Sequence, residues 1–127
     1  QLLQQSDFIV VAVDLNHESQ ALIGEAQFDL MQKHAVFINI ARGSVVDENT
    51  LIDALQQNKI FAAGLDVYAK EPLQSSALFE LANVVTAPHI GSATAETRKK
   101  MVDLAYQNLI DALEDRTPRY LVNPKFE

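Results

Sequence analysis

Four short apolar runs recur along the chain and predict the strands of a β-sheet. They occupy residues Phe8–Val13, Ala35–Ile40, Phe61–Val67 and Val84–Ala87. Each run is nearly continuous in apolar residues instead of alternating with polar ones, which is typical of strands covered on both faces. Because the runs are separated by segments long enough for a helix, they indicate repeated strand–helix–strand units and a parallel sheet.

The segments between the runs carry helical patterns. Gly24–Lys33 has apolar residues at helical spacing, and Glu48–Gln57 has one apolar face with Asp47 placed to cap its first turn. A shorter segment, Ser76–Leu81, connects the third and fourth runs. The pattern therefore predicts an α/β fold in which strands alternate with helices.

A long amphipathic helix is predicted after the fourth run. Ser92 or Thr94 can cap its start, and apolar residues at i, i+3, i+4 and i+7 continue to about Glu114. The tail from Thr117 contains two prolines and the apolar residues Tyr120–Val122. We expect this tail to form an arm that packs on another surface.

Length and composition limit the classes of function. At 127 residues the chain is one domain at most, and it begins at Gln1 within a helical pattern, so we expect a piece of a longer protein. It has 10 basic and 17 acidic residues, which disfavours nucleic-acid binding through a basic patch. The absence of cysteine excludes disulfides and thiolate metal sites, and no apolar run reaches the ~18 residues of a membrane span.

Three charged residues lie just past the ends of predicted strands: Arg42, Glu71 and His89. The carboxyl ends of parallel strands form the edge of a sheet where ligands bind. A guanidinium binds a carboxylate through paired hydrogen bonds, and an imidazole exchanges protons near neutral pH. A carboxylate beside the imidazole favours its protonated form. Together the three residues predict a site that holds a carboxylate substrate and moves a proton.

Each of these residues alone has a simpler interpretation. Arg42 can pair on the surface with Asp47 or Glu48. His89 can be a neighbour of a helix start with no chemical role, and Glu71 can be a solvated loop residue. The repeated placement at strand ends favours the functional interpretation of the set.

Two further residues near these strand ends attract attention. Asp66 is an acid within the apolar segment Ala63–Val67, where burial is costly unless the carboxylate is bonded. It either faces a ligand or bonds neighbouring backbone, and we favour the ligand. Gly43, next to Arg42, is expected to let the backbone turn sharply or approach a ligand closely.

At these residues the chain resembles the D-isomer-specific 2-hydroxyacid dehydrogenases. The matching segments are Asn39–Glu48, Ala63–Val67 followed by Glu71-Pro72, and Ala87–Ser92, in the order and spacing of the family. The resemblance extends from about Ser6 to the Val122-Asn-Pro124 tail. Within the family, the run Pro88–Arg98 looks most like the glyoxylate/hydroxypyruvate and 2-ketogluconate reductases.

The resemblance implies a role for each charged residue. Arg42 would bind a small 2-oxo acid through its carboxylate and carbonyl. His89 would deliver a proton to the carbonyl oxygen while the nicotinamide of NAD or NADP delivers a hydride to carbon. Glu71 would keep His89 oriented and protonated. No metal is implied.

The resemblance also implies a cofactor edge. The residues that would line it are Val13, Asp14, Ala41, Arg42, Asp66, His89 and Gly91. The sequence departs from the family's pattern in one loop, where Asp14-Leu15-Asn16 stands in place of the usual Pro-Leu-Thr and brings a negative charge to this edge.

The family's organisation implies how the chain divides. Residues 1–92 would be the C-terminal half of a doubly wound, Rossmann-type dinucleotide-binding domain, and residues 93–127 a return helix and tail that pack on a substrate domain. The glycine-rich phosphate loop and the substrate domain are not in this sequence, so we expect the chain alone to be inactive. The whole enzyme would be a cytoplasmic homodimer that binds neither nucleic acid nor membrane.

Two alternatives stay open. The chain could belong to a dehydrogenase-like corepressor or scaffold, or it could be a non-catalytic fragment that serves binding or dimerisation. The complete set of Arg42, Glu71 and His89 argues against a scaffold, which needs none of the three.

Overall fold

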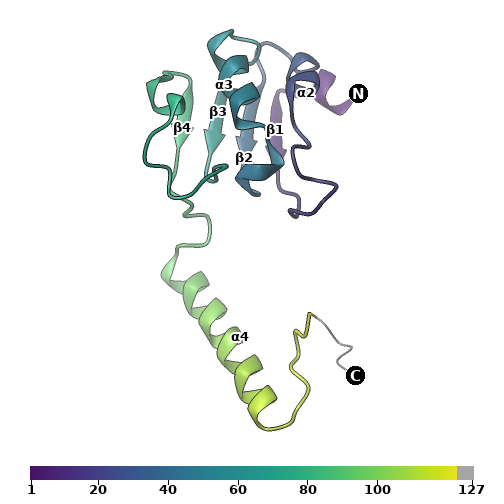
Figure 1. Cartoon of the computed structure of the whole chain (residues 1–127), viewed down its shortest axis with the longest axis vertical. Helices are drawn as coiled ribbons and strands as arrows, with labels where there is room; N and C mark the ends of the chain where they lie inside the picture. Colours follow the sequence, from purple (N-terminus) through teal and green to yellow (C-terminus); the bar gives the residue numbers. More distant parts are fainter. Residues whose placement is uncertain (123–127) are drawn as a thin grey trace. The chain divides into compact units, whose positions relative to one another are not determined.

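The computed structural model describes residues 1–122, and the chain divides into two compact units, Gln1–Ile90 and Gly91–Glu127. Figure 1 shows the elements of each unit. The first unit holds the sheet, and the second holds one long helix and the tail as far as Val122. Pro124, one of the two prolines of the predicted arm, lies outside the described residues.

The first unit is built on a four-stranded parallel sheet with the strand order β1-β2-β3-β4. Each strand occupies the amino-terminal or central part of one predicted run, which confirms the predicted α/β fold. The strands end before the runs do, because the last apolar residues of each run turn away into the loops at the carboxyl edge. The strands are β1 (Phe8–Val11), β2 (Val36–Asn39), β3 (Ala62–Leu65) and β4 (Val84–Thr86).

Side-chain caps start two of the elements between the strands, and one of them, Asp47, is the cap that the sequence predicts. Asp47 Oδ1 accepts a hydrogen bond from the backbone N–H of Thr50 at 3.0 Å, and this starts α3. Ser76 Oγ accepts from the N–H of Leu78 at 3.2 Å, which starts the 3₁₀ turn η2. The helical elements between the strands are α2 (Glu25–Asp29), η1 (Gly43–Val45), α3 (Glu48–Gln56) and η2 (Ala77–Glu80), and α1 (Leu2–Gln5) precedes β1.

One face of the sheet is covered. Helices α2 and α3 contact each other and lie on the same side of the strands (Figure 1). Under them the aromatic rings of Phe28 and Phe37 meet edge to face, with their centroids 5.3 Å apart. Leu51 and Leu55 of α3 and Ile60 after it are fully buried in the same core.

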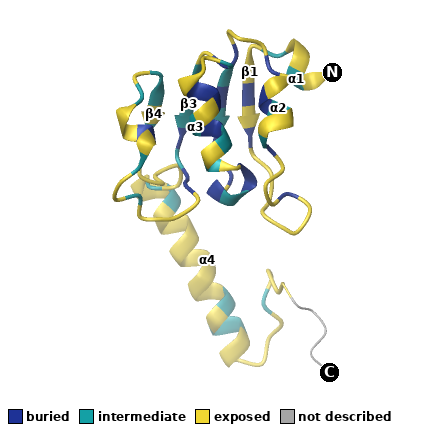
Figure 2. Ribbon diagram, turned by 45° about the horizontal axis from the view of Figure 1, so that its top comes forward, coloured by how far each residue is buried: buried dark blue, intermediate teal, exposed yellow. Residues whose placement is uncertain are grey.

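The opposite face of the sheet is apolar, with exposed residues on the edge strands β1 and β4 and half-buried residues on β2 and β3, so the prediction that both faces are covered is wrong for the described residues. Buried and exposed residues alternate along β1 (Figure 2). Phe8, Val10 and Val85 point to the open face and are 68%, 53% and 74% exposed. Crossovers between neighbouring parallel strands are almost always right-handed, so connections that step in one direction place their helices on one side. We call this surface the open face.

The second unit contains α4 (Ala95–Leu113). Of the two predicted caps, Thr94 is the one used, because its Oγ1 accepts from the N–H of Thr97 at 3.2 Å. No residue of α4 is buried, and apolar residues such as Met101 and Leu109 are exposed. Among the described residues, no helix combines the length and the apolar character needed to cross a bilayer.

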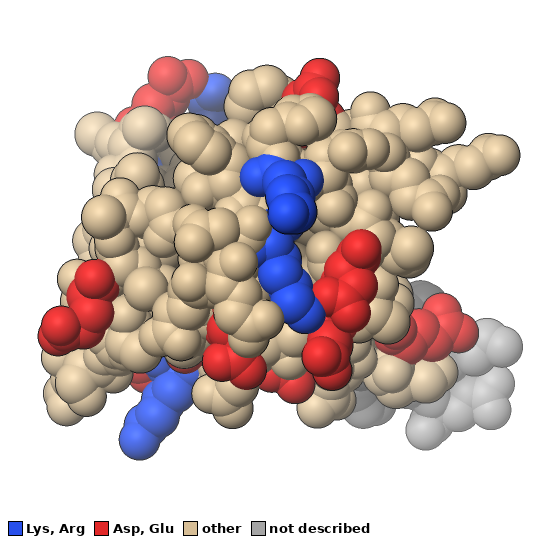
Figure 3. Space-filling view, turned by 90° about the horizontal axis from the view of Figure 1, so that it is seen from above, with Lys and Arg blue, Asp and Glu red and all other residues tan. Residues whose placement is uncertain are grey.

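Acidic and basic side chains are mixed on the surface at the amino ends of the strands. Seen from the top of Figure 1, basic side chains form a short central row with acidic side chains on its flank, and neutral side chains occupy most of the rest (Figure 3). Lys59, which follows α3, pairs with Asp29 of α2 at 2.5 Å. This pairing ties the two helices together at their exposed ends.

Gly43 marks the tightest approach of two loops at the carboxyl edge. A Cβ atom added to Gly43 would lie 1.8 Å from the carbonyl carbon of Tyr68 and 2.3 Å from the nitrogen of Ala69. The glycine does not have a positive φ. Its requirement is therefore space: of the two predicted roles, a sharp turn or a close approach to a ligand, the structure shows a close approach, but to the chain's own backbone after β3.

We expect Gly43→Ala to destabilise the first unit, because the added methyl group forces rigid backbone segments apart. Overpacking of this kind costs about 1–3 kcal/mol, and urea unfolding of the chain measures it. Gly64→Ala is the matched control, since its added Cβ would meet Ile38 Cγ1 at an ordinary 3.8 Å. Equal unfolding midpoints for the two variants would contradict the assignment of Gly43 as a packing requirement.

Candidate active site

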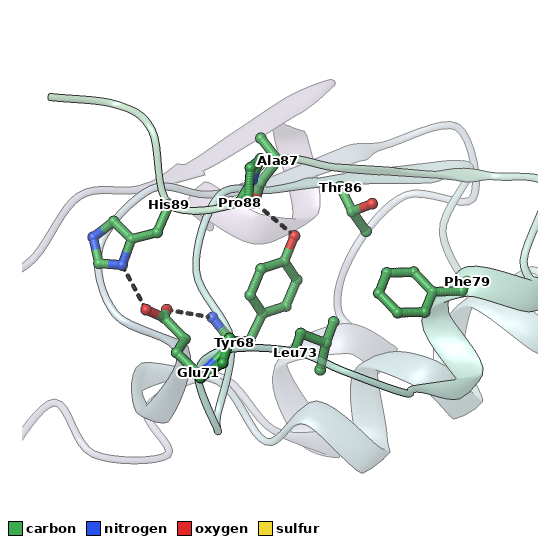
Figure 4. A pocket seen from close by; sticks show the side chains of 9 residues that line it. Tyr68, Glu71, Leu73, Phe79, Thr86, Ala87, Pro88 and His89 are labelled. Atoms are coloured by element: carbon green, nitrogen blue, oxygen red, sulfur yellow. Dashed lines mark hydrogen bonds and ion pairs between the residues drawn. The ribbon is translucent and has the colours of Figure 1, made fainter. Parts of the chain in front are cut away.

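Hollows lie at the carboxyl ends of the strands, and two of them are lined by residues that the sequence predicts for the site. One has a volume of about 480 Å³ and is lined by residues that follow β1 and β2, among them Val13, Asp14, Ala41 and Arg42. The other has a volume of about 470 Å³ and is lined by residues that follow β3 and β4, including Glu71 and His89 (Figure 4). All the sequence-predicted residues of the first unit except Asp66 thus line these two hollows.

His89 and Glu71 form a direct pair at the second hollow. Nδ1 of His89 lies 2.6 Å from Oε2 of Glu71, and the other carboxylate oxygen, Oε1, accepts a hydrogen bond from the backbone N–H of Tyr68 at 3.0 Å. The two side chains are 41% and 34% exposed, so both are accessible to a ligand. In Figure 4 the second ring nitrogen of His89 points away from Glu71, where it is free to meet a substrate.

The pairing keeps Glu71 ionised. The hydrogen bond to His89, followed by that from the Tyr68 N–H, lowers the pKa of the Glu71 carboxyl below its ordinary value, and the charges of His89 and Arg42 add to the shift. Because folding lowers this pKa, the contacts stabilise the folded state above the carboxyl group's ordinary pKa. That contribution is lost as the pH falls through the lowered pKa.

The backbone of His89 has an uncommon conformation. Its φ angle is 54°, in the left-handed region that residues with a Cβ atom adopt rarely. The His89 N–H donates to the carbonyl of Ala87 at 3.1 Å, and the next N–H, that of Ile90, donates to Asp66 Oδ1 at 2.8 Å. These bonds hold the residue in a turn that presents its side chain beside Glu71.

The Asp66 carboxylate bonds neighbouring backbone, which is the alternative that we did not favour. Its bond to the N–H of Ile90 joins the residue after β3 to the loop after β4. The energetic reason is that a carboxylate at the end of an apolar strand needs a hydrogen-bond donor, and this exposed N–H supplies one. Contact of Asp66 with a cofactor stays a prediction.

Arg42 is presented by a buried amide. Asn39, the last residue of β2, is 2% exposed, and its Oδ1 accepts from the Ala41 N–H at 3.1 Å while its Nδ2 donates to the Arg42 carbonyl at 3.2 Å. This closes the turn after β2 and turns the exposed Arg42 side chain out of the core. The guanidinium Nη1 donates to the Ala41 carbonyl at 2.6 Å.

The surface-pair interpretation of Arg42 is wrong within the part of the chain that the structure describes. Asp47 caps α3, and Glu48 Oε2 accepts from the backbone N–H of Ala69 at 3.0 Å. Neither carboxylate pairs with Arg42. The guanidinium is therefore available to a ligand at the hollow it lines.

The loop after β1 is ordered by its own polar groups. Asn16 Oδ1 accepts from the N–H groups of Glu18 and Ser19, at 2.8 and 3.0 Å. The buried Ser19 hydroxyl donates to the Asp14 carbonyl at 2.6 Å. The loop thus holds Val13 and Asp14 at the first hollow, although their contact with a cofactor stays a prediction. Gly91 belongs to the second unit, and its predicted contact also stays a prediction.

Sequence reasoning missed two residues that shape the site. Asn39 carries a detectable signal, because it is a polar residue at the end of an otherwise apolar run. Tyr68 is 7% exposed, and its hydroxyl donates to the carbonyl of Ala87 at 2.7 Å, two residues before His89. Nothing local in the sequence indicates this contact, because it joins residues 19 positions apart.

Comparison with solved structures gives the same fold. The protein TT0316 from Thermus thermophilus has a TM-score of 0.89 and 38% identity over 94% of this chain and 39% of its own. An NADPH-dependent glyoxylate/hydroxypyruvate reductase from Sinorhizobium meliloti, in complex with NADP and malonate, has a TM-score of 0.85 and 32% identity over 94% of this chain and 41% of its own. A D-lactate dehydrogenase with NAD⁺ from Lactobacillus jensenii has a TM-score of 0.83 at 29% identity, over 94% of this chain and 40% of its own.

Sequence comparison is more specific. The glyoxylate/hydroxypyruvate reductase B of Salmonella newport is 52% identical over 125 residues, which are 98% of this chain and 39% of the relative. The predicted likeness to reductases of this class is thus confirmed, and the chain spans about two fifths of their length. Residues 1–91 match the family described as D-isomer specific 2-hydroxyacid dehydrogenase, NAD binding domain. The chain therefore belongs to the D-isomer-specific 2-hydroxyacid dehydrogenase family.

Proposed function

We propose that this chain is part of an NAD(P)-dependent reductase and carries its catalytic residues. The reductase converts a small 2-oxo acid to a D-2-hydroxy acid, or catalyses the reverse reaction. The substrate class is that of glyoxylate, hydroxypyruvate and 2-ketogluconate. The observation that carries the proposal is the 2.6 Å pair of His89 and Glu71 beside an unpaired Arg42 in the described residues. The names of the relatives from Salmonella newport and Sinorhizobium meliloti support the substrate class.

The residues of the two hollows fit the nicotinamide end of a dinucleotide. The first hollow is lined by apolar residues, among them Val13 and Ala41, together with the charged Asp14 and Arg42. When bound, the cofactor supplies the hydride that adds to the carbonyl carbon of the substrate. Residues that would hold its pyrophosphate belong to the glycine-rich turn at the start of such a domain, and this sequence has no such turn.

The side chains then perform binding and proton transfer. Arg42 binds the substrate carboxylate, because a guanidinium offers paired donors in the geometry of two carboxylate oxygens. His89, through the nitrogen that does not face Glu71, donates its proton to the carbonyl oxygen as negative charge develops there. The ionised Glu71 orients the ring through its 2.6 Å contact with Nδ1 of His89.

The second candidate is a binding or dimerisation role without catalysis. The open face of the sheet and the exposed apolar residues of α4 favour it, since large apolar patches mark surfaces that other protein covers. The two candidates are compatible if the whole enzyme is a homodimer. We therefore propose that the whole enzyme is a homodimer. We also propose that it is located in the cytoplasm.

In a full-length enzyme that carries this sequence, His89→Ala should lower kcat for glyoxylate or hydroxypyruvate by about 10²–10⁴-fold, the usual contribution of a general acid. Affinity for NADH or NADPH should change little, because the proton donor acts on the substrate. Steady-state kinetics measure both. His34→Ala is the matched control, since His34 pairs with Asp7 at the amino ends of the strands. Turnover like that of the wild type in His89→Ala would remove the proton-donor role.

Replacement of Glu71 tests the pair through the pH dependence of reduction. Glu71 holds the His89 ring through the 2.6 Å contact while its carboxylate is ionised, and the pKa of that carboxyl lies below its ordinary value. The reduction rate should therefore decline at low pH as Glu71 takes up a proton, and Glu71→Gln should remove this decline. The measurement is the pH profile of kcat/KM for the 2-oxo acid, with the exposed Glu80→Gln as control. If the profile of Glu71→Gln coincides with that of the wild type, Glu71 does not act on the proton donor.

The 127-residue chain by itself should neither reduce glyoxylate nor bind NADH with micromolar affinity. The reason is that the turn that neutralises the pyrophosphate is missing, and so is the second wall of the cleft that positions donor and acceptor. Fluorescence titration with NADH and an assay at high chain concentration measure the two properties. Tight NADH binding by the chain alone would show that its own residues form the complete cofactor site.

A further inference from the structure

We propose that Tyr68 is a positioning residue of the proton-donating pair, holding the loop that carries Glu71 against the loop that carries His89. The inference rests on the proposed function in that the pair is taken to act in reduction. Its structural part, the hydrogen bond from the buried Tyr68 hydroxyl to the loop that carries His89, stands on the contacts of the chain itself.

Tyr68 bonds both members of the pair, one directly and one through its loop. Its backbone N–H donates to Glu71 Oε1 at 3.0 Å, and its hydroxyl donates to the carbonyl of Ala87 at 2.7 Å (Figure 4). The same hydroxyl lies 3.1 Å from the carbonyl of Leu65 at the end of β3. One residue thus connects three groups: its backbone N–H bonds the Glu71 carboxylate, and its hydroxyl contacts the end of β3 and the residue two positions before His89.

The hydroxyl is a dependable donor because it is buried. Tyr68 is 7% exposed, and its ring lies between the His89–Glu71 pair and the apolar side chains of Leu73 and Phe79 (Figure 4). Burial raises the pKa of the phenol above its ordinary value, so the hydroxyl keeps its proton throughout the neutral range. The backbone of Tyr68 is in turn fixed by its close packing on Gly43.

The His89 turn needs this support. A left-handed residue with a Cβ atom persists only when its surroundings hold it there. The Ala87 carbonyl accepts both the His89 N–H, at 3.1 Å, and the Tyr68 hydroxyl, while Asp66 holds the N–H of Ile90. Without the hydroxyl, the Ala87 carbonyl can rotate and the His89 backbone can relax toward an ordinary φ. The imidazole would then lose its fixed distance to Glu71.

Tyr68→Phe tests this in the full-length enzyme, because it removes only the hydroxyl and keeps the ring and the N–H bond to Glu71. We expect kcat with glyoxylate or hydroxypyruvate to fall about tenfold to a hundredfold, the effect of small misplacements of a reacting group. KM and NADPH or NADH affinity should stay near their wild-type values. Tyr106→Phe, at an exposed tyrosine of α4, is the matched control and should leave kcat unchanged.

The second readout is spectroscopic and does not depend on activity. With histidine labelled at the ring carbon Cε1, the His89 resonance, assigned by its absence in His89→Ala, should shift or broaden in Tyr68→Phe and not in Tyr106→Phe. A merely structural loss would instead lower the midpoint of thermal unfolding with the His89 resonance unchanged.

The outcomes separate cleanly. A selective loss of kcat together with a changed His89 resonance supports the positioning role. Unchanged kcat, or a loss of kcat with an unchanged His89 resonance, overturns it. If the wild-type enzyme reduces none of the 2-oxo acids, the proposed function fails, and the His89 resonance alone decides whether Tyr68 positions the imidazole.

Discussion

The parallel direction of the four strands brings the ends of β2, β3 and β4 to one edge of the sheet. Arg42, Glu71 and His89 follow these three strand ends, so the hydrogen-bond ladder determines that they are neighbours. A strand running the other way would carry its terminal loop to the opposite edge. The helices contribute indirectly, because their burial on one face keeps the strands in register.

Within that edge, backbone groups do much of the positioning. The Asn39 amide closes the turn that exposes Arg42, and Asp66 accepts from the N–H after His89. Glycine at position 43 lets the first loop pack directly on the backbone of the second. The geometry of the charged side chains is therefore set by hydrogen bonds between polar side chains and the backbone, of which the bond from the Ala41 N–H to Asn39 is buried and costly to break.

The open face of the sheet and the exposed apolar residues of α4 both indicate surfaces that other protein covers. Large apolar side chains such as Phe8 and Val85 are exposed to water in the described structure, at a cost that covering protein removes. Each connection leads to the next strand in the same direction, and such crossovers are right-handed. The connecting helices therefore all lie on the other face of the sheet. In the proposed homodimeric enzyme, a second subunit or a further domain would cover the open face of the sheet and the apolar residues of α4.

The sequence by itself determined the order of strands and helices and the identity of the charged residues at the strand ends. These features depend on local periodicity and on short-range caps such as Asp47 and Thr94, which neighbouring residues decide. The apolar runs predict strands that are longer than those observed, because apolar residues continue into the loops beyond the hydrogen-bonded part of each strand. Only the tertiary structure decided that one face is open, that Asp66 bonds the backbone at Ile90 and that Gly43 is needed for close packing. The same holds for Tyr68, whose hydroxyl meets a carbonyl 19 residues away. Such contacts arise between segments that the fold brings together, and no local pattern of residues encodes them.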